Sequence, residues 1–199
     1  MDVPFVGLTG GLAAGKSTAL AALQRLGART LSTDAVVHEL YTEAELRDLV
    51  VERWGADVAP DGTVDRARVA ERVFADEAER KWLESVVWPM VGARVWAFRQ
   101  AAEAADPPPA AAVVETPFLF EAGMESGYDA TIAVIAPEAL RSERAGERGH
   151  HGVDQRNSRH LTQEEKAARA TYTVVNDGSI ADLESRLADV LADLVRVPS

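Results

Sequence analysis

Short apolar runs alternate along this chain with longer segments that have helical periodicity. Five runs have the length of buried strands and lie at residues 3–9, 28–32, 110–116, 130–136 and 172–176. Apolar residues between the first two runs recur at helical spacing, up to a stop at Gly27. Strands that alternate with helices predict an α/β fold, in which helices flank both faces of a five-stranded parallel sheet.

Two regions extend this pattern. Residues 42–105 are helical in character and stand between two strands, so we expect a helical insertion there. Trp88-Pro89 is expected to break it, because proline lacks the N–H that a helix interior needs. The second region is residues 137–165: it contains a charged helix at residues 138–149 and the start of another helix, residues 162–170, which begins with a capping box at Thr162 and Glu165. We expect residues 1–199 to form one unit that carries both additions.

A glycine-rich segment follows the first strand. Gly10, Gly15, Lys16 and Ser17 fit the pattern G-x-x-x-x-G-K-[ST], and a helix follows directly. This pattern predicts a loop whose backbone N–H groups and helix N-terminus hold phosphates. Lys16 would reach the outer phosphates, and the Ser17 hydroxyl would bind Mg²⁺. A turn that fits by chance is the alternative, and the position between strand and helix favours the phosphate loop. The other expected nucleotide contacts are Gly11, Ala13, Ala14 and Thr18.

Asp34 and His38 come just after the second strand. This edge of an open parallel sheet is where ligands bind. Asp34 could accept a proton from a hydroxyl of the acceptor, or it could cap the N-terminus of the next helix, and spacing alone does not decide between them. His38 lies four residues later on the same helical face, where a structural histidine is the more common case.

Arg141, Arg144 and Arg148 share one face of a predicted helix, and Arg156 and Arg159 follow. Such a positive cluster could neutralise charge during phosphoryl transfer. The alternative is a solvated helix with ion pairs to Glu143 and Glu147. His150-His151 lies in a predicted loop without carboxylate or cysteine partners, so we expect no metal site there.

The composition narrows the possible classes. The 199 residues carry a formal net charge of −11, so we expect no nucleic-acid partner. The apolar runs are too short to cross a membrane, and there is no cysteine for disulfides or thiolate metal sites. We find no export signal and expect a cytoplasmic protein. The sequence does not give the oligomeric state, and we take a monomer as the default.

A phosphate loop alone is compatible with several classes. We find no N-K-x-D element of the kind that reads guanine. A motor or transporter ATPase would use an acid after an apolar strand, and Glu115 could be read that way. A small kinase needs an acceptor site and mobile arginines as well.

Taken together, the motifs resemble the bacterial dephospho-coenzyme A kinase family over nearly the whole chain. The similar segments are "GLTGGLAAGKST", "STDAVVHEL", "DGTVDRARVAERVFAD", "VVETPFLFEAG", "RSERAGERG" and "EEKAARATYTVVNDG". The resemblance implies a P-loop kinase fold, with a helical acceptor-binding insertion at 42–105 and a lid at 137–165. It also implies that ATP, with Mg²⁺, phosphorylates the ribose 3′-hydroxyl of dephospho-coenzyme A, in the last step of coenzyme A synthesis.

The resemblance also implies roles for individual residues. Asp34 takes the position of the catalytic aspartate, and Arg144 and Arg148 take those of the lid arginines. Asn176 would lie near the nucleotide base. The acceptor site would comprise Asp34, His38, Pro117, Leu119 and Glu121.

The chain departs from the family pattern at Ser32, Trp88, Arg141, His160 and Ala170-Thr171. The stretch after His38 is also a little shorter than in the family. The changes at Trp88 and around Leu40 affect acceptor recognition more than phosphate transfer. A kinase of the same fold that acts on another acceptor, such as a nucleoside, therefore remains an alternative. A nucleotide-binding regulator without turnover is the second alternative.

Overall fold

A computed structural model describes residues 3–147 and 161–196 of the chain. The chain divides into two compact units, of which the first contains Met1–Leu31 and Phe98–Ser199 and the second contains Ser32–Ala97. The second unit thus starts before the insertion expected at 42–105 and ends before its last residues.

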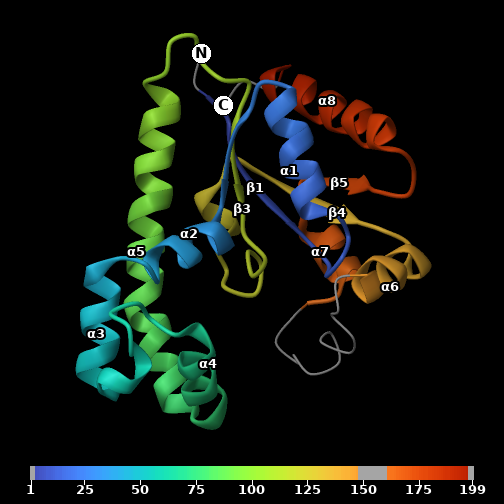
Figure 1. Ribbon diagram of the computed structural model, residues 1–199. Coiled ribbons are helices and arrows are strands. Elements are labelled where there is room, and N and C mark those ends of the chain that lie inside the picture. The colour runs from blue at the N-terminus through green and yellow to red at the C-terminus, as the bar shows by residue number, and fades with distance from the viewer. Residues whose placement is uncertain (1–2, 148–160, 197–199) are drawn as a thin grey trace. The chain divides into compact units, whose positions relative to one another are not determined.

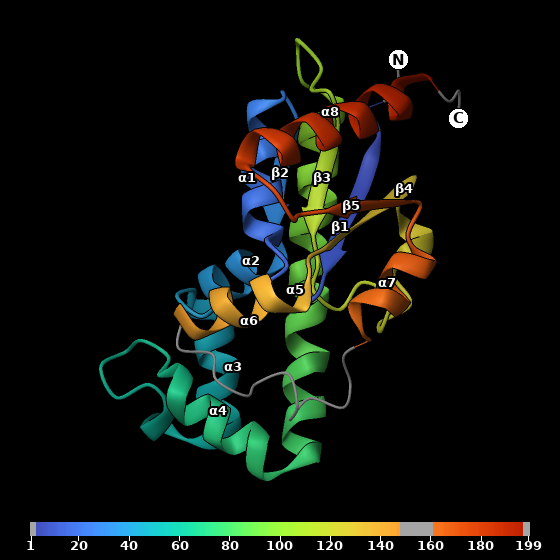
Figure 2. The same cartoon turned by 90° about the vertical axis from the view of Figure 1, so that its right-hand side faces the viewer.

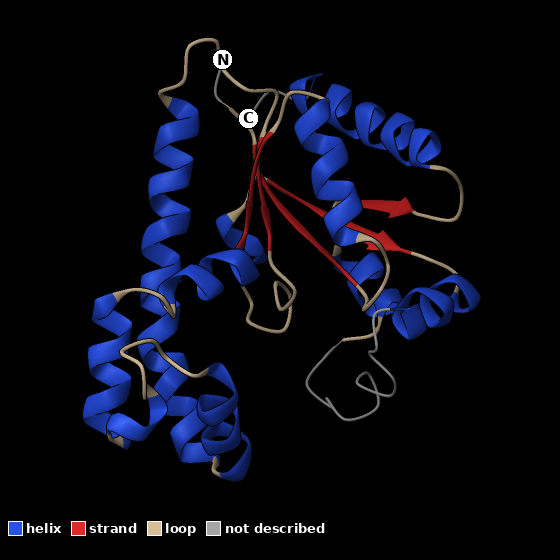
Figure 3. Ribbon diagram, in the orientation of Figure 1, coloured by secondary structure: helices blue, strands red, loops and turns tan. Residues whose placement is uncertain are grey.

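A five-stranded sheet forms the centre of the first unit (Figures 1 and 3). Its strands are β1 (Phe5–Gly10), β2 (Arg29–Ser32), β3 (Ala112–Glu115), β4 (Ala130–Ile135) and β5 (Tyr172–Val175). Their order is β2-β3-β1-β4-β5, and β1 pairs in parallel with both β3 and β4. Four of the strands lie within the runs that the hydrophobic pattern predicted, and β1 extends one residue beyond its run, to Gly10. The prediction of a five-stranded parallel sheet is confirmed.

The side chains of β1 point alternately to two helical layers. Val6 and Leu8 belong to the core under helices α1 (Lys16–Arg25) and α8 (Ile180–Arg196), which pack against each other (Figure 2). Thr9 points to the other face, where α7 (Gln163–Arg169) packs against β1 and β4. Helices therefore cover both faces, as predicted.

The C-terminal ends of the strands lead into the segments that carry the candidate site. Helix α6 (Glu138–Glu147) follows β4, and a 3₁₀ turn, η2 (Glu125–Gly127), lies between β3 and β4. The predicted capping box at the start of α7 is confirmed: Thr162 Oγ1 accepts from the Glu165 N–H, and the Glu165 carboxylate accepts from the Thr162 N–H.

The second unit is helical. It contains α2 (Thr33–Leu40), α3 (Ala44–Trp54), the 3₁₀ turn η1 (Ala56–Val58), α4 (Arg66–Ala75) and most of α5 (Glu77–Glu103) (Figure 1). Its own small core includes Leu40, Leu46, Val50, Val58 and Val69, each almost inaccessible to solvent. No helix among the described residues combines the length and hydrophobicity needed to span a membrane.

The predicted break at Trp88-Pro89 is wrong, because α5 runs through Pro89 without interruption. Contacts on both sides of the proline fix the position of the helix. Before it, the Trp82 ring packs edge-on against the Trp54 ring, with centroids 4.9 Å apart. After it, Arg94 Nη2 lies 2.7 Å from Glu43 Oε1. The chain breaks earlier, at Asp76, whose carboxylate accepts from the Ala78 N–H and so caps the start of α5.

Candidate active site

The glycine-rich loop connects β1 to α1, and two of its glycines cannot be replaced without a clash. Gly10 has φ +156°, and a Cβ there would lie 2.2 Å from the Val134 carbonyl oxygen. Gly15, the N-cap of α1, has φ +97°, and its Cβ would lie 2.1 Å from Asn176 Nδ2. The loop thus lies directly against the neighbouring strands, an approach that only glycine permits.

The loop leads into a helix N-terminus that suits an anion. No acidic residue lies in the first turn of α1. Lys16 Nζ donates to the carbonyl oxygens of Gly10 and Gly11 at 3.2 and 3.0 Å, so the ammonium lies over the loop. Ser17 is exposed in the same turn. The positive end of the helix dipole, the ammonium and the N–H groups therefore act together on one small region.

Two arginines of α6 lie close to this loop. Arg141 Nη1 is 2.9 Å from the position of a Cβ on Gly11, and Arg144 Nη1 is 3.9 Å from that of a Cβ on Gly15. Arg141 also pairs with Glu138. Arg141 Nε and Arg144 Nη1 are buried, and neither has a hydrogen-bond partner among the residues that the structure describes. Since burying a charged donor without a partner is unfavourable, this arrangement favours an anion at the loop.

The interpretation of this helix as a solvated face with ion pairs to Glu143 does not account for these buried nitrogens. The other members of the predicted cluster, Arg148, Arg156 and Arg159, lie outside the described residues, as do His150, His151 and His160.

Polar side chains from β5 and α7 support the loop and its surroundings. Asn176, buried after β5, donates through Nδ2 to the Ala14 carbonyl oxygen at 2.9 Å. Gln163 Nε2 donates to the Ala136 carbonyl oxygen at 3.0 Å, and Gln163 Oε1 accepts from the Ala136 N–H at 3.1 Å. In the structure the Asn176 amide holds the phosphate loop, and its place near the nucleotide base stays a prediction. Sequence reasoning missed Gln163, because only the fold brings it to the end of β4.

The segment after β3 carries the expected acceptor residues Pro117, Leu119 and Glu121. Leu119 is fully buried, with Cδ1 next to Gly7. Glu121 Oε1 accepts from Lys166 Nζ at 3.0 Å and from the Leu161 N–H at 2.9 Å. Burial acts to raise the pKa of Glu121, but the hydrogen bonds from Lys166 and from backbone N–H groups outweigh it and lower the pKa. Lys166 is a second residue that sequence reasoning missed.

Asp34 and His38 belong to the second unit. Asp34 is exposed in the first turn of α2, whose N-cap is Ser32, so the interpretation of Asp34 as the N-cap is wrong. His38 Nδ1 lies 2.6 Å from Arg66 Nη1, and Arg66 also lies over the Tyr41 ring. Burial raises the pKa of Tyr41, and the Arg66 charge opposes this. That Asp34 and His38 meet the phosphate loop stays a prediction.

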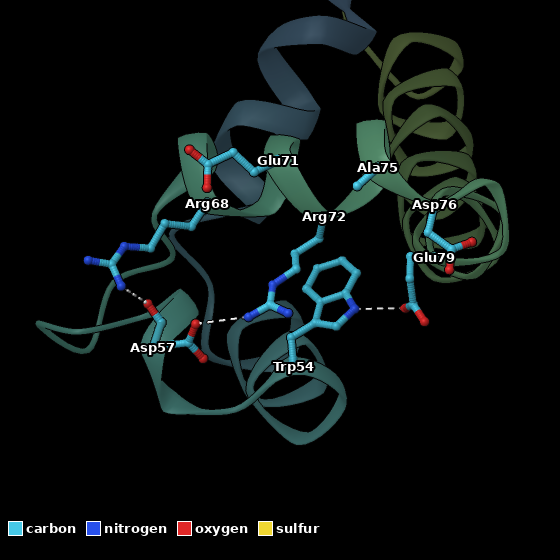
Figure 4. Close-up of a pocket in the computed structure, with 8 residues that line it drawn as sticks. All are labelled: Trp54, Asp57, Arg68, Glu71, Arg72, Ala75, Asp76 and Glu79. Atoms are coloured by element: carbon cyan, nitrogen blue, oxygen red, sulfur yellow. Dashed lines mark hydrogen bonds and ion pairs between the residues drawn. The ribbon is translucent and has the colours of Figure 1, made fainter.

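The second unit also contains a cavity of 540 Å³ (Figure 4). Its polar walls are held by their own contacts: Trp54 Nε1 donates to Glu79, and Arg72 pairs with Asp57. The pKa of Glu79 is lowered by its hydrogen bonds with Arg53 and Trp54. The lining residues are Trp54, Asp57, Arg68, Glu71, Arg72, Ala75, Asp76 and Glu79, none of which was predicted for a site.

The described residues offer few side-chain ligands for a metal ion. The described residues contain no group of three or more histidine, cysteine or acidic side chains that could hold a metal ion. The exposed hydroxyl of Ser17 is an oxygen ligand of the type that Mg²⁺ prefers, and Mg²⁺ commonly takes its other ligands from water and phosphate. The site therefore fits Mg²⁺ that arrives with a nucleotide.

Solved structures share this fold over almost the whole chain. A structure described as TT1252 from Thermus thermophilus is 32% identical, with a TM-score of 0.79, and covers 98% of this chain and 99% of its own. Dephospho-CoA kinase from Campylobacter jejuni has a TM-score of 0.69 at 24% identity, with 96% of both chains covered. Shikimate kinase from Acinetobacter baumannii, at 15% identity and a TM-score of 0.51, shares the fold.

Sequence comparisons agree with the fold. Dephospho-CoA kinase from Deinococcus radiodurans is 38% identical over 95% of this chain and 91% of its own length. That from Anaeromyxobacter dehalogenans is 37% identical, with the same coverage. The family model for dephospho-CoA kinase matches residues 4–182. The chain therefore belongs to the dephospho-CoA kinase family.

Proposed function

We propose that this chain transfers the γ-phosphoryl group of ATP to the ribose 3′-hydroxyl of dephospho-coenzyme A, giving coenzyme A and ADP. Family membership supports the reaction and the acceptor. The observation that carries the proposal is the pair of buried guanidinium nitrogens, Arg141 Nε and Arg144 Nη1, which lack a hydrogen-bond partner in the described part of the chain. Their guanidinium groups lie beside the glycine loop, where phosphates would supply the missing acceptors.

The loop would bind the β- and γ-phosphates through its N–H groups. Lys16, which now donates to two loop carbonyls, would turn its ammonium to the phosphate oxygens. Ser17 would bind Mg²⁺, which supplies further positive charge at the transferring group. Arg144 would stabilise the charge that develops on the phosphoryl oxygens, and we propose the same role for Arg148.

Asp34 would act on the acceptor. Its exposed carboxylate would accept the proton of the 3′-hydroxyl as the new bond between that oxygen and the γ-phosphorus forms. The bond between the γ-phosphorus and the β–γ bridging oxygen breaks at the same time, and ADP leaves. His38, which Arg66 fixes through Nδ1, and the segment Pro117–Glu121 would orient the acceptor.

The test is ADP release from Mg-ATP with dephospho-coenzyme A, with adenosine, and with no acceptor. We expect stimulation by dephospho-coenzyme A alone. Asp34→Asn should lower kcat by about 10²- to 10⁴-fold, because it removes the general base, and should leave ATP binding unchanged. Asp48→Asn is the matched control, since Asp48 is an exposed carboxylate of the same unit that pairs with the adjacent Arg47.

Other outcomes select between the alternatives. Stimulation by adenosine instead would retain the kinase and discard dephospho-coenzyme A as its acceptor. ATP binding without stimulation by any acceptor would favour a regulator without turnover. Full activity of Asp34→Asn would exclude the assigned role of Asp34.

A further inference from the structure

A buried ammonium group joins three segments of the first unit. Lys166, on α7, is only 1% exposed. Its Nζ donates to the Pro117 carbonyl oxygen at 2.5 Å and to Glu121 Oε1 at 3.0 Å, and it lies 3.5 Å from Thr9 Oγ1. An ammonium has three N–H donors, so these acceptors can engage all of them.

The three partners lie where the sheet meets the candidate site. Thr9 is the residue before Gly10, the first glycine of the phosphate loop. Pro117 and Glu121 are the two ends of the segment after β3 that is expected to line the acceptor site. Thr9 Oγ1 also donates to the Pro117 carbonyl oxygen at 3.2 Å. One lysine therefore ties the acceptor segment to the strand that leads into the phosphate loop.

The same network reaches the start of α7. Glu121 Oε1 accepts from both Lys166 Nζ and the Leu161 N–H, so a single carboxylate oxygen fixes the backbone just before the helix. The low pKa of Glu121 keeps it ionised at neutral pH despite the burial that acts against this. A buried ion pair seldom adds stability over a well-packed apolar pair, whereas it does fix a geometry.

Between the two tethered ends, Leu119 is fully buried and lies against Gly7. The segment is thus held at Pro117, Leu119 and Glu121, and Lys166 is the side chain that takes part in the tethers at both of its ends. We propose that Lys166 is a positioning residue for the acceptor, which acts by fixing the segment Pro117–Glu121 and does not touch the substrate itself. This inference rests on the proposed function.

The first test compares Lys166→Met with Lys81→Met. Methionine keeps the length of the side chain and removes the charge. We expect the KM for dephospho-coenzyme A to rise about tenfold or more in Lys166→Met, because the acceptor then binds only the fraction of molecules in which the segment is ordered, with the KM for ATP unchanged. Lys81, an exposed lysine that pairs with Glu77 on the surface, should tolerate the same change.

A chemical rescue separates positioning from general stability. The chain has no cysteine, so Lys166→Cys introduces a single thiol. Alkylation of the unfolded variant with 2-bromoethylamine, followed by refolding, restores an ammonium at nearly the length of lysine. We expect this treatment to return the KM for dephospho-coenzyme A towards that of the wild type. The wild-type chain, taken through the same treatment, is the control.

Glu121→Gln keeps the test decisive if Lys166→Met does not fold. It retains the shape of the side chain and an acceptor for the Leu161 N–H, and removes the charge that Lys166 binds. We expect the KM for dephospho-coenzyme A to rise and the KM for ATP to stay constant. An equal rise of both constants, or a rescue that restores the melting temperature and not the KM, would show a structural role and overturn the proposal.

The wild-type chain separates this inference from the proposed function. If dephospho-coenzyme A does not stimulate ADP release by the wild type, the proposed function fails and the role of Lys166 fails with it. If the wild type is active and Lys166→Met leaves the KM for dephospho-coenzyme A and the KM for ATP unchanged, only the role of Lys166 is wrong.

Discussion

Gly15→Ala tests the geometry of the phosphate loop directly. Gly15 has φ +97° and ψ 28°, a left-handed conformation that residues with a Cβ disfavour. The added Cβ would lie 2.1 Å from Asn176 Nδ2, which donates to the Ala14 carbonyl oxygen. Asn176 would therefore have to move, and its hydrogen bond to the loop would break.

The two costs can be sized separately. A left-handed residue with a Cβ costs about 1–2 kcal/mol. Loss of a typical intramolecular hydrogen bond costs about 0.5–1.5 kcal/mol. The total is about 1.5–3.5 kcal/mol, and it lowers the free energy of unfolding if the loop keeps its shape. If the loop relaxes instead, the same energy appears as a loss of ATP affinity of about 10- to 400-fold.

Urea unfolding measures the free energy of unfolding, and calorimetric titration with ATP measures the affinity for ATP. Gly92→Ala is the control, because Gly92 lies inside α5 and, apart from its chain neighbours and the backbone of its own helix, no atom of the described residues lies within 4 Å of its Cβ position. We expect Gly92→Ala to stabilise the protein by about 0.5–1 kcal/mol and to leave ATP affinity unchanged. Wild-type stability together with wild-type ATP affinity in Gly15→Ala would refute the reasoning.

Three further predictions use other parts of the site. Thr162→Ala should lower the free energy of unfolding by about 1 kcal/mol, because it removes the N-cap of α7, and thermal unfolding checks this. The folded-state pKa of Glu121 is depressed, so its stabilisation is complete above its ordinary value of 4.5 and is lost as the pH falls through the lower value. Urea unfolding across that pH range should therefore show that the wild type loses its advantage in free energy of unfolding over Glu121→Gln as the pH falls. A difference in free energy that stays constant with pH would contradict this prediction. Arg144→Gln should lower kcat by about tenfold or more, measured as ADP release, if Arg144 stabilises the transferring phosphoryl group; unchanged kcat would exclude that role.

Most of the sheet and the phosphate loop could be predicted because their signals are local. A buried strand has a continuous apolar run, and the spacing of Gly10, Gly15 and Lys16 is contained within a few residues. The capping box at Thr162 is local too. In each case the residues that form the structure are neighbours in the chain, so the pattern and the contact coincide.

The contacts that support the site could not be found in this way, although the family resemblance had pointed to Asn176 itself. Asn176 donates a hydrogen bond to the Ala14 carbonyl oxygen, 162 residues away in sequence, and Lys166 donates one to the Pro117 carbonyl oxygen, 49 residues away. Their types allow many roles, and only the fold selects one. The continuous helix through Pro89 shows the same limit, because a local rule predicted a break and tertiary contacts on both sides of the proline prevailed.

Charge distinguishes the site more sharply than the arginine spacing did. The chain carries a formal net charge of −11, so carboxylates are available to neutralise most guanidinium groups. Arg53 and Arg94 illustrate this, since each pairs with a glutamate at the surface. Arg144 Nη1, in contrast, is buried near Gly15 with no hydrogen-bond partner from the described residues. In so acidic a protein, a buried guanidinium nitrogen that lies beside the glycine loop and has no acceptor among the described residues is a stronger indication of phosphate binding than three arginines on one helical face, because its position costs free energy until an anion binds.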